Sequence, residues 1–430
     1  MNEKLFNFLN QAYSPYHNVN YFKNELLRDG FKELKEDEPF SLEKGGQYFV
    51  IRNLTSLLAF KVGKNIEENT HFQMVASHSD SPVFKIKEHV FTECGGFQKL
   101  IVEPYGGMIH SCWLDKPLGI GGRIIIQKGN SLVSKLVNLD NINVIIPNLA
   151  IHMNREINNG YKYNPQSDLS PIIGEACGEN LLEKKLNESL LEGEKLISYD
   201  LYLYNKEEAT FLGFNNELIG APKLDDLMCA FTTFEGFLEA SNDNIISLYA
   251  LFDNEEVGST SINGANSNFL DSVTKRIYLS FFNDSDKYFA SLASSSLLSA
   301  DNAHAIHPNR PDVSENNSPV EMNKGVVVKH NANMHYCSDA LSTALVKKLA
   351  EDNKLNIQEY FNRSDIRGGS TLGNISISHV SILSVDIGLA QLAMHSNYET
   401  IGAKDYLDMV KLVSSYMKQD IKVKEGNIIF

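Results

Sequence analysis

The chain has 430 residues, a length that suggests two domains or one domain with an insertion. Hydrophobic residues make up 43% of the sequence and charged residues 22%, which is ordinary for a folded globular protein. The formal net charge is −15 and the sequence contains no basic stripe, so nucleic acid and anionic membrane surfaces are poor candidates for partners.

The features that bear on cellular location favour a soluble protein of the cytoplasm. The N-terminal stretch MNEKLFNFLNQAYSP has an early acidic residue and only a short apolar patch, so it does not predict a signal peptide. No segment approaches the roughly 18 apolar residues that a membrane-spanning helix requires. The five cysteines are scattered and form no CxxC motif, which argues against a disulfide framework and a thiolate zinc site.

The first 30 residues predict two amphipathic helices, separated at Ser14-Pro15. The second helix has Val19, Phe22, Leu26 and Leu27 on one face, and Gly30 is placed to cap it. Strand-like runs follow in YFVIRNL, LLAFKVG and HFQMVASHSD, before a change of pattern near Val83.

From Val83 to about Gly220 strand-like alternation dominates, as in FKIKEHVF, RIIIQK and LISYDLYLY. From Pro222 onward helical segments alternate with short apolar runs, which is typical of an α/β sheet. We therefore predict a discontinuous α/β domain, residues 1–85 and 220–430, whose mixed sheet is covered by helices on both faces. Residues 86–219 are predicted to form an inserted β-rich domain, which is tolerated because closing a longer loop costs little.

Polar side chains directly follow several of the apolar runs, at the strand ends where α/β sheets collect their ligands. Taken singly, each has an ordinary explanation, such as a helix cap or a solvated turn. Together, imidazoles and carboxylates at one sheet edge require a cation, and nitrogen and oxygen ligands without thiolates suit zinc, cobalt or manganese. These residues are His78, Asp80, Asp225, Asp226, Glu255, Glu256, Asp301, His304, His307 and His395.

This set is large enough for two metal ions, which need a bridging carboxylate, terminal ligands and a free base for the water. Other chemistries lack their motifs. GGSTLG has Leu372 where a GxSxG motif has its second glycine, and GIGGRI does not complete GxGxxG. The sequence also contains no Walker loop and no HExxH motif.

Six segments resemble, in order, the signatures of the M18 metallo-aminopeptidases, the aspartyl aminopeptidase family. They are ASHSDSP, KLDDL, LFDNEEVGS, SADNAHAIHPN, GGSTLGN and VDIGLAQLAMHS, and the resemblance runs from about residue 14 to the C-terminus. Ala390 stands where the family pattern has a proline, and the insertion matches mainly around NLAIHMNRE. These departures concern specificity and packing more than the metal ligands.

The resemblance implies two zinc ions per subunit, with cobalt or manganese as substitutes. Glu255 would be the general base, and Asp80 would orient a ligating imidazole. If the backbone at Glu255-Glu256 is extended, the two side chains point in different directions, so that one binds metal and the other faces the water. The implied ligands are His78 and Asp301 for one ion, Glu256 and His395 for the other, and Asp225 as the bridge.

Three further residues match family positions that bind substrate. His152 lies in the insertion and would reach an active site, its own or a neighbouring subunit's; its alternatives are a half-buried strand histidine and an additional metal ligand. His307 and Lys329 would line the substrate pocket, where the lysine could pair with an acidic substrate side chain. Without the resemblance, Lys329 would be interpreted as a solvated strand end.

The resemblance predicts a metallo-aminopeptidase that removes N-terminal residues from peptides, with acidic residues (Asp or Glu) as the candidate preference. It implies a zinc-exopeptidase-type fold whose β-rich insertion serves dimerisation, with dimers assembling into a tetrahedral dodecamer. The alternatives are another two-metal hydrolase on the same fold, such as a carboxypeptidase or N-deacylase, and an inactive metal-stabilised scaffold. Glu255 speaks against the scaffold, which has no need of a spare base.

Overall fold

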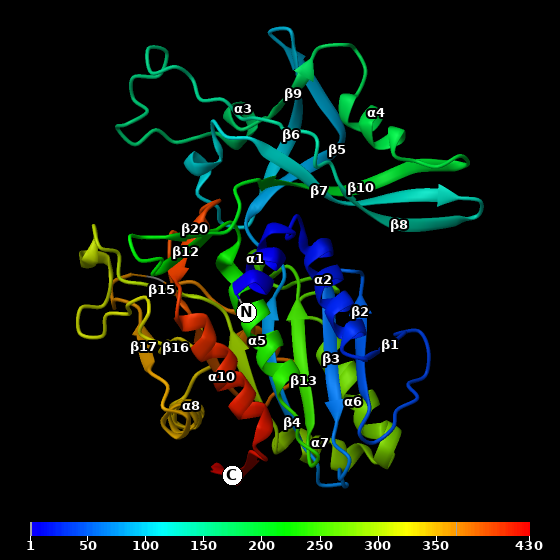
Figure 1. Cartoon of the computed structure of the whole chain (residues 1–430), viewed down its shortest axis with the longest axis vertical. Coiled ribbons are helices and arrows are strands. Elements are labelled where there is room, and N and C mark those ends of the chain that lie inside the picture. Colours follow the sequence, from blue (N-terminus) through cyan, green and yellow to red (C-terminus); the bar gives the residue numbers. More distant parts are fainter. Residues whose placement is uncertain (1, 367) are drawn as a thin grey trace. The chain divides into compact units, whose positions relative to one another are not determined.

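The computed structural model describes residues 2–366 and 368–430 (Figure 1). The chain forms two compact units, each built from segments that are distant in sequence. Unit 1 consists of the residues up to Asn18, Ser81–Ala209 and His395–Tyr398. Unit 2 consists of Val19–Asp80, Thr210–Met394 and Glu399–Phe430.

Unit 2 contains a mixed nine-stranded sheet. Its central strands β13, β4, β14 and β18 are parallel, whereas β3 and β16 pair with them in antiparallel fashion. In spatial order the strands are β1 (Lys32–Leu34), β2 (Gln47–Arg52), β3 (Ser56–Val62), β13 (Ile246–Phe252), β4 (Phe72–His78), β14 (Ser296–Ala300), β18 (Leu383–Gly388), β16 (Val326–His330) and β17 (Ile357–Phe361).

Helices cover both faces of this sheet, as the sequence predicts. On one face Leu248 and Phe252 of β13 join a core with Ile277 of α6 and Tyr288 of α7. On the other face the ring of Tyr249 packs against α5 and α10 packs against α5 (Figure 1). The helices are α2 (Pro15–Arg28), α5 (Leu224–Glu239), α6 (Phe269–Phe282), α7 (Ser285–Ala293), α8 (Ala340–Asn353), α9 (Leu372–Ser376) and α10 (Asp405–Lys418). The first turn of α2, up to Asn18, belongs to unit 1.

Two smaller sheets complete unit 2. The first has five strands, in the order β11 (Thr210–Leu212), β12 (Leu218–Ala221), β20 (Glu399–Gly402), β19 (Ala390–Leu392) and β15 (Ala303–His304). The second is the C-terminal pair β21 (Lys422–Lys424) and β22 (Asn427–Ile429). Short 3-10 turns lie at Glu255–Val257 and Pro311–Val313.

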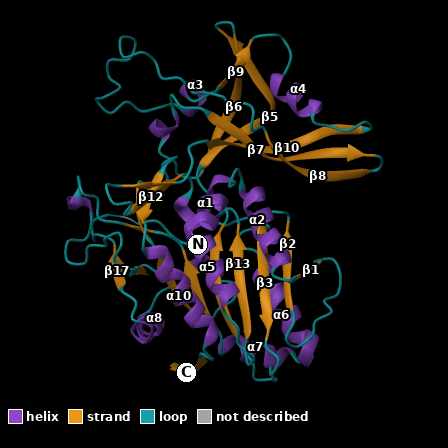
Figure 2. Ribbon diagram, viewed as in Figure 1, coloured by secondary structure: helices purple, strands orange, loops and turns teal. Residues whose placement is uncertain are grey.

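Unit 1 is built on a six-stranded antiparallel sheet, whose strands are drawn in orange in Figure 2. Trp113, Ile120 and Leu201 are buried in its core. The strand order is β8 (Ser131–Asn138), β7 (Leu118–Lys128), β10 (Glu194–Asn205), β5 (Val83–Cys94), β6 (Phe97–Tyr105) and β9 (Ile172–Glu175). Its helices are α1 (Asn2–Asn10), α3 (Pro165–Asp168), α4 (Leu181–Glu188) and the 3-10 turn His110–Trp113.

The two N-terminal helices predicted from the sequence are present as α1 and α2. Val19, Phe22 and Leu26 are buried as expected, but Leu27 is 47% exposed because it lies beside the apolar stripe rather than on it. Gly30 follows α2 with a φ of +83°, the left-handed conformation of a helix cap. Among the described residues, no helix is long and apolar enough to cross a membrane.

Lys61 of β3 stabilises the C-terminal end of α5. Its Nζ donates to the carbonyl oxygens of Phe237, Leu238 and Ala240, at 3.0, 2.9 and 2.7 Å. A cation in this position binds carbonyl groups at the helix end, of which, among the described residues, only that of Phe237 also accepts a backbone N–H, from Ala240 at 3.3 Å. Burial lowers the pKa of Lys61 to about 8, so at pH 7 the side chain still carries its proton.

We expect Lys61→Met to lower the free energy of unfolding by about 2 kcal/mol, because three carbonyl groups lose a charged donor while the aliphatic packing is kept. Chemical denaturation at pH 7 measures the effect. The control is Lys64→Met, since Lys64 is exposed and its ion pair with Asp243 spans 3.5 Å, a geometry that contributes little. Equal midpoints for the two variants would refute the capping role.

Candidate active site

The candidate site of unit 2 begins at the end of β4, where His78 and Asp80 are buried. The Nδ1 atom of His78 lies 3.1 Å from the Asp80 carbonyl oxygen and 3.3 Å from its Oδ1. A proton on Nδ1 is therefore held by Asp80. The other ring nitrogen, Nε2, faces Asp225 and lies 3.7 Å from its Oδ1 atom. Burial alone would lower the pKa of His78, but the carboxylates of Asp226 and Asp80 raise it well above its usual value.

Asp225 and Asp226 precede the regular part of α5 and are joined by a cis peptide bond. The backbone N–H of Asp225 donates to Oε2 of Glu399 at 2.9 Å. Oδ2 of Asp226 accepts the backbone N–H of His78 at 3.3 Å, while Oδ1 of Asp226 is buried with no hydrogen-bond donor among the described residues. The sequence pointed to both aspartates but assigned a role only to Asp225, because a contact to the backbone of β4 leaves no pattern in the sequence.

Glu255 and Glu256 occupy the 3-10 turn Glu255–Val257 that follows β13. The expectation of extended backbone is wrong here, because Asn254 and Gly258 on either side have φ values of 63° and 92° and make a tight turn. The backbone N–H groups of Glu255 and Glu256 donate to Oδ1 and Oδ2 of Asp80, at 3.1 and 3.2 Å. Asp80 thus holds both the imidazole of His78 and the turn that carries the two glutamates.

The glutamate side chains lie in a strongly acidic environment. Burial, with repulsion from neighbouring carboxylates, raises the pKa of Glu255 to about 8. Burial and the carboxylate of Asp225 also raise the pKa of Glu256 well above its usual value. Both shifts express the cost of several negative charges in one buried place.

Asp301 follows β14 and is paired with Lys329 of β16. The Lys329 Nζ atom lies 3.3 Å from Oδ2 of Asp301 and donates to the carbonyl oxygen of Asn302 at 3.1 Å. It also lies 5.2 Å from the ring centroid of Tyr336, a residue that the sequence did not single out. Lys329 is 2% exposed, so its interpretation as a solvated strand end is wrong.

These side chains converge closely enough to share cations. One ligand atom from each of His78, Asp225, Asp226 and Asp301 lies within 4.8 Å of the others, and the same holds for His78, Glu255 and Glu256. Imidazole nitrogen and carboxylate oxygen without thiolate is a donor set that zinc uses. The donors fit zinc, and a divalent cation would relieve the repulsion that raises the carboxylate pKa values.

The other predicted site residues have the following surroundings. His395 belongs to unit 1, where its Nδ1 lies 2.9 Å from the carbonyl oxygen of Gly107. His152 is exposed in a turn of unit 1, and His307 is exposed in a turn of unit 2, where its Nδ1 accepts the N–H of Asn309 at 3.2 Å. The roles of these three histidines stay predictions.

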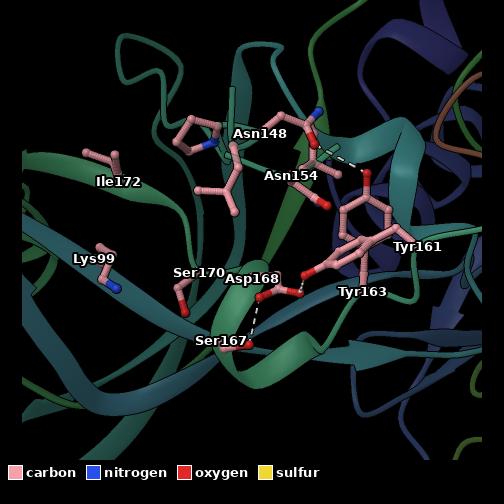
Figure 3. A pocket seen from close by; sticks show the side chains of 12 residues that line it. Lys99, Asn148, Asn154, Tyr161, Tyr163, Ser167, Asp168, Ser170 and Ile172 are labelled. Atoms are coloured by element: carbon pink, nitrogen blue, oxygen red, sulfur yellow. Dashed lines mark hydrogen bonds between the residues drawn. The ribbon is translucent and has the colours of Figure 1, made fainter. Parts of the chain in front are cut away.

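A cavity of about 200 Å³ lies within unit 1 and is lined by residues between Lys99 and Ile172 (Figure 3). Tyr161 donates to Asp168 at 2.9 Å, and Tyr163 donates to Asn148 at 3.3 Å. The polar groups of these four lining residues therefore bind one another. None of the predicted site residues lines the cavity. The acidic cluster of unit 2, rather than this cavity, is therefore the candidate active site.

Residues 8–417 match the family model described as aminopeptidase I zinc metalloprotease (M18). The chain belongs to the M18 family of aminopeptidases. It is 39% identical over 417 residues to a probable M18 family aminopeptidase 2 of Clostridium acetobutylicum, with 95% of this chain and 96% of that protein covered. A probable M18 family aminopeptidase 2 of Pseudomonas paraeruginosa is 35% identical over 97% of both chains. The protein is therefore a metallo-aminopeptidase, a hydrolase of peptide bonds.

Solved structures of M18 aminopeptidases share the fold. The S. cerevisiae mApe1 dodecamer matches with a TM-score of 0.86 at 30% identity, covering 97% of this chain and 96% of that one. The M18 aminopeptidase of Thermotoga maritima matches with a TM-score of 0.85 at 22% identity, covering 97% and 95%, a likeness that concerns the fold alone. These matches confirm the predicted α/β zinc exopeptidase fold.

The acidic cluster predicts that a divalent cation stabilises the folded M18 protein. We expect a chelator to lower the midpoint of thermal unfolding and added zinc to restore it. An ion that binds only the folded state contributes about 2.7 kcal/mol at a hundredfold excess over its Kd. Asp225→Ala should respond far less to zinc, since it removes a carboxylate from the centre of the cluster. A wild-type midpoint that responds to neither chelator nor zinc would contradict the interpretation.

Proposed function

We propose that this M18 enzyme holds two zinc ions, mainly through side chains of unit 2, and removes the N-terminal residue from peptides, with Asp and Glu as the candidate preferred residues. The observation that carries the proposal is the convergence of His78, Asp225 and Asp301 in one group and His78, Glu255 and Glu256 in another. Neighbouring buried carboxylates with an imidazole among them are expected where cations bind.

The proposed ligands combine this geometry with the family resemblance. His78 and Asp301 would hold one ion, Glu256 and His395 the other, and Asp225 would bridge them. When bound, two such ions lower the pKa of a water molecule and polarise the carbonyl group of the scissile bond.

The assignment of His395 rests on the resemblance and on the path of the chain. His395 lies four residues before Glu399, whose carboxylate accepts the N–H of Asp225. His395 is therefore a near neighbour in sequence of a residue that binds the backbone of the proposed bridging ligand.

Glu255 is proposed as the general base. It would accept a proton from the attacking water and later donate it to the leaving amine. The geometry supports this role, because the backbone N–H of Glu255 donates to Asp80 at 3.1 Å and so fixes the turn that carries its carboxylate beside His78. Asp80 would orient His78 through Nδ1, as carboxylates do for ligating histidines.

Substrate recognition is proposed to involve Lys329, His307 and His152, as the resemblance implies. An acidic substrate side chain would have to share the Lys329 ammonium with Asp301, which lies 3.3 Å away. A free α-amine held near the ions would restrict cleavage to the chain end.

We also propose that the β-rich insertion, residues 86–219, serves dimerisation and that dimers assemble into a tetrahedral dodecamer. The support is the family membership and the S. cerevisiae relative, which is a dodecamer. A cytoplasmic location is the accompanying expectation.

Glu255→Gln should keep the bound zinc and lose turnover by roughly 10²- to 10⁴-fold, because an amide binds no proton under these conditions. Metal analysis together with hydrolysis of aminoacyl anilides checks both parts. Glu239→Gln, at an exposed position of α5, is the matched control. Near-normal turnover of the Glu255 variant would remove this residue from its role, and hydrolysis of N-acyl amino acids instead of anilides would refute aminopeptidase specificity.

Lys329→Met removes the ammonium group and keeps most of the buried volume. If the lysine pairs with acidic substrates, kcat/KM for Glu and Asp anilides should fall at least about tenfold more than kcat/KM for the Leu anilide, as expected for loss of a charged hydrogen bond. Rates are compared per bound zinc, since Asp301 also loses its partner. An equal loss on all substrates would show that the lysine serves Asp301 and not the substrate.

A further inference from the structure

The buried aspartate of β18, Asp386, has no part in the proposed chemistry, yet it connects three segments of unit 2. Its Oδ2 accepts the backbone N–H of Cys337 at 2.5 Å, and its Oδ1 accepts the hydroxyl of Thr371 at 2.9 Å. Its own N–H donates to the Ser338 hydroxyl at 3.0 Å. Asp386 thereby joins β18 to the loop before α8 and to the start of α9.

The packing of α9 against this carboxylate depends on a glycine. A Cβ atom at Gly373 would lie 2.7 Å from Oδ1 of Asp386 and 2.6 Å from Oγ of Ser299. Real Cβ atoms do not approach neighbours so closely, so only glycine brings the start of α9 to the carboxylate. The GGSTLG motif and the VDIG motif, which the sequence singled out separately, meet at this point.

A carboxylate is the one side chain of this size that suits these donors. Asp386 is 0% exposed; its three hydrogen bonds named above are with neutral groups, and its negative charge also helps to raise the pKa of the buried Lys329. Burying a charge costs free energy unless hydrogen bonds compensate it. An asparagine would present an N–H₂ group to one of the two donors, leaving that donor and the amide unsatisfied.

Two routes connect Asp386 to the Asp301–Lys329 pair. The first runs through Tyr336, which precedes Cys337 in the chain, is 4% exposed and lies 5.2 Å from Nζ of Lys329. The second runs along β18, since the carbonyl oxygen of Ile387 accepts the N–H of Asp301 at 2.9 Å. A shift of the loop before α8 would therefore move Tyr336 relative to Lys329 and disturb the pair that Lys329 forms with Asp301.

We propose that Asp386 is a positioning residue of the active site: its carboxylate holds the Tyr336–Ser338 and Thr371–Gly373 segments together and so keeps Tyr336 and Lys329 in place beside Asp301. This inference rests on the proposed function, in which Asp301 is a zinc ligand. Residues that orient a metal site through its neighbours typically change activity or metal affinity by about 10- to 100-fold when replaced.

The test is Asp386→Asn in the full chain, loaded with zinc. The matched control is Asp405→Asn, because Asp405 is also 0% exposed and accepts two backbone N–H groups, from Asn323 at 2.6 Å and Gly325 at 2.8 Å. A milder variant, Thr371→Val, removes the hydroxyl group that donates to Asp386. It tests the proposal if Asp386→Asn does not fold. The measurements are hydrogen exchange, zinc content, and kcat and KM on Leu and Glu anilides.

In Asp386→Asn we expect faster exchange in residues 333–339 and 371–376, retained zinc, and kcat/KM per bound zinc lower by roughly 10- to 100-fold. Asp405→Asn should show neither the exchange change nor the loss. Thr371→Val should speed exchange in residues 371–376 with a smaller loss of kcat/KM. Unchanged exchange in both segments, or unchanged kcat/KM per zinc, overturns the proposal. Failure of the proposed function is distinguishable, because it would appear as an inactive zinc-loaded wild type.

Discussion

The structure of the site is governed by the repulsion among carboxylates that are buried at one edge of a sheet. Asp80, Asp225 and Asp226 are at most 3% exposed and Asp301 is 7% exposed, and Glu255 and Glu256 lie in the turn beside them. Lys329 pairs with Asp301, and the imidazole of His78 lies within 4.0 Å of Asp80, Asp225 and Asp226, so these two bases offset only part of the negative charge. Since buried charges of one sign cost free energy, such a cluster persists in a folded protein when a cation balances it. This requirement links the fold to a metallo-enzyme.

The parallel strands explain why the acids converge. β4 pairs in register with β13 and β14, so the residues that follow these strands meet at the same edge. The geometry beyond that is supplied by backbone hydrogen bonds to carboxylates. Asp80 accepts the N–H groups of the Glu255 turn, and Asp226 accepts the N–H of His78. Asp80 and Asp226 thus contribute negative charge to the site and also bind the backbone of the segments that carry its other residues.

Much of the fold and several site residues could be predicted from the sequence because their signals are local. Apolar runs that end in His78, Glu255 or Asp301 mark strand ends, and alternation of helices and strands marks the α/β sheet. What could not be predicted depends on contacts between distant residues. Asp80 and Glu255 are 175 positions apart, and the pairing of Lys329 with Asp301 is equally invisible in the sequence. The tight turn at Glu255 was not predicted, although Asn254 and Gly258, which flank it with φ values of 63° and 92°, are of the residue types that favour positive φ.

Two of the points at which the chain crosses between the units lie next to proposed site residues. The chain enters the insertion at Ser81, directly after Asp80, and it visits unit 1 again at His395–Tyr398, directly before Glu399. Asp80 holds the glutamate turn, and Glu399 holds the backbone of Asp225. A displacement of the chain at either of these two crossings would therefore act on the same acidic cluster, through Asp80 in one case and through Glu399 in the other. In this family member the chain therefore leaves and re-enters unit 2 directly beside two carboxylates, Asp80 and Glu399, that bind the backbone of proposed metal ligands.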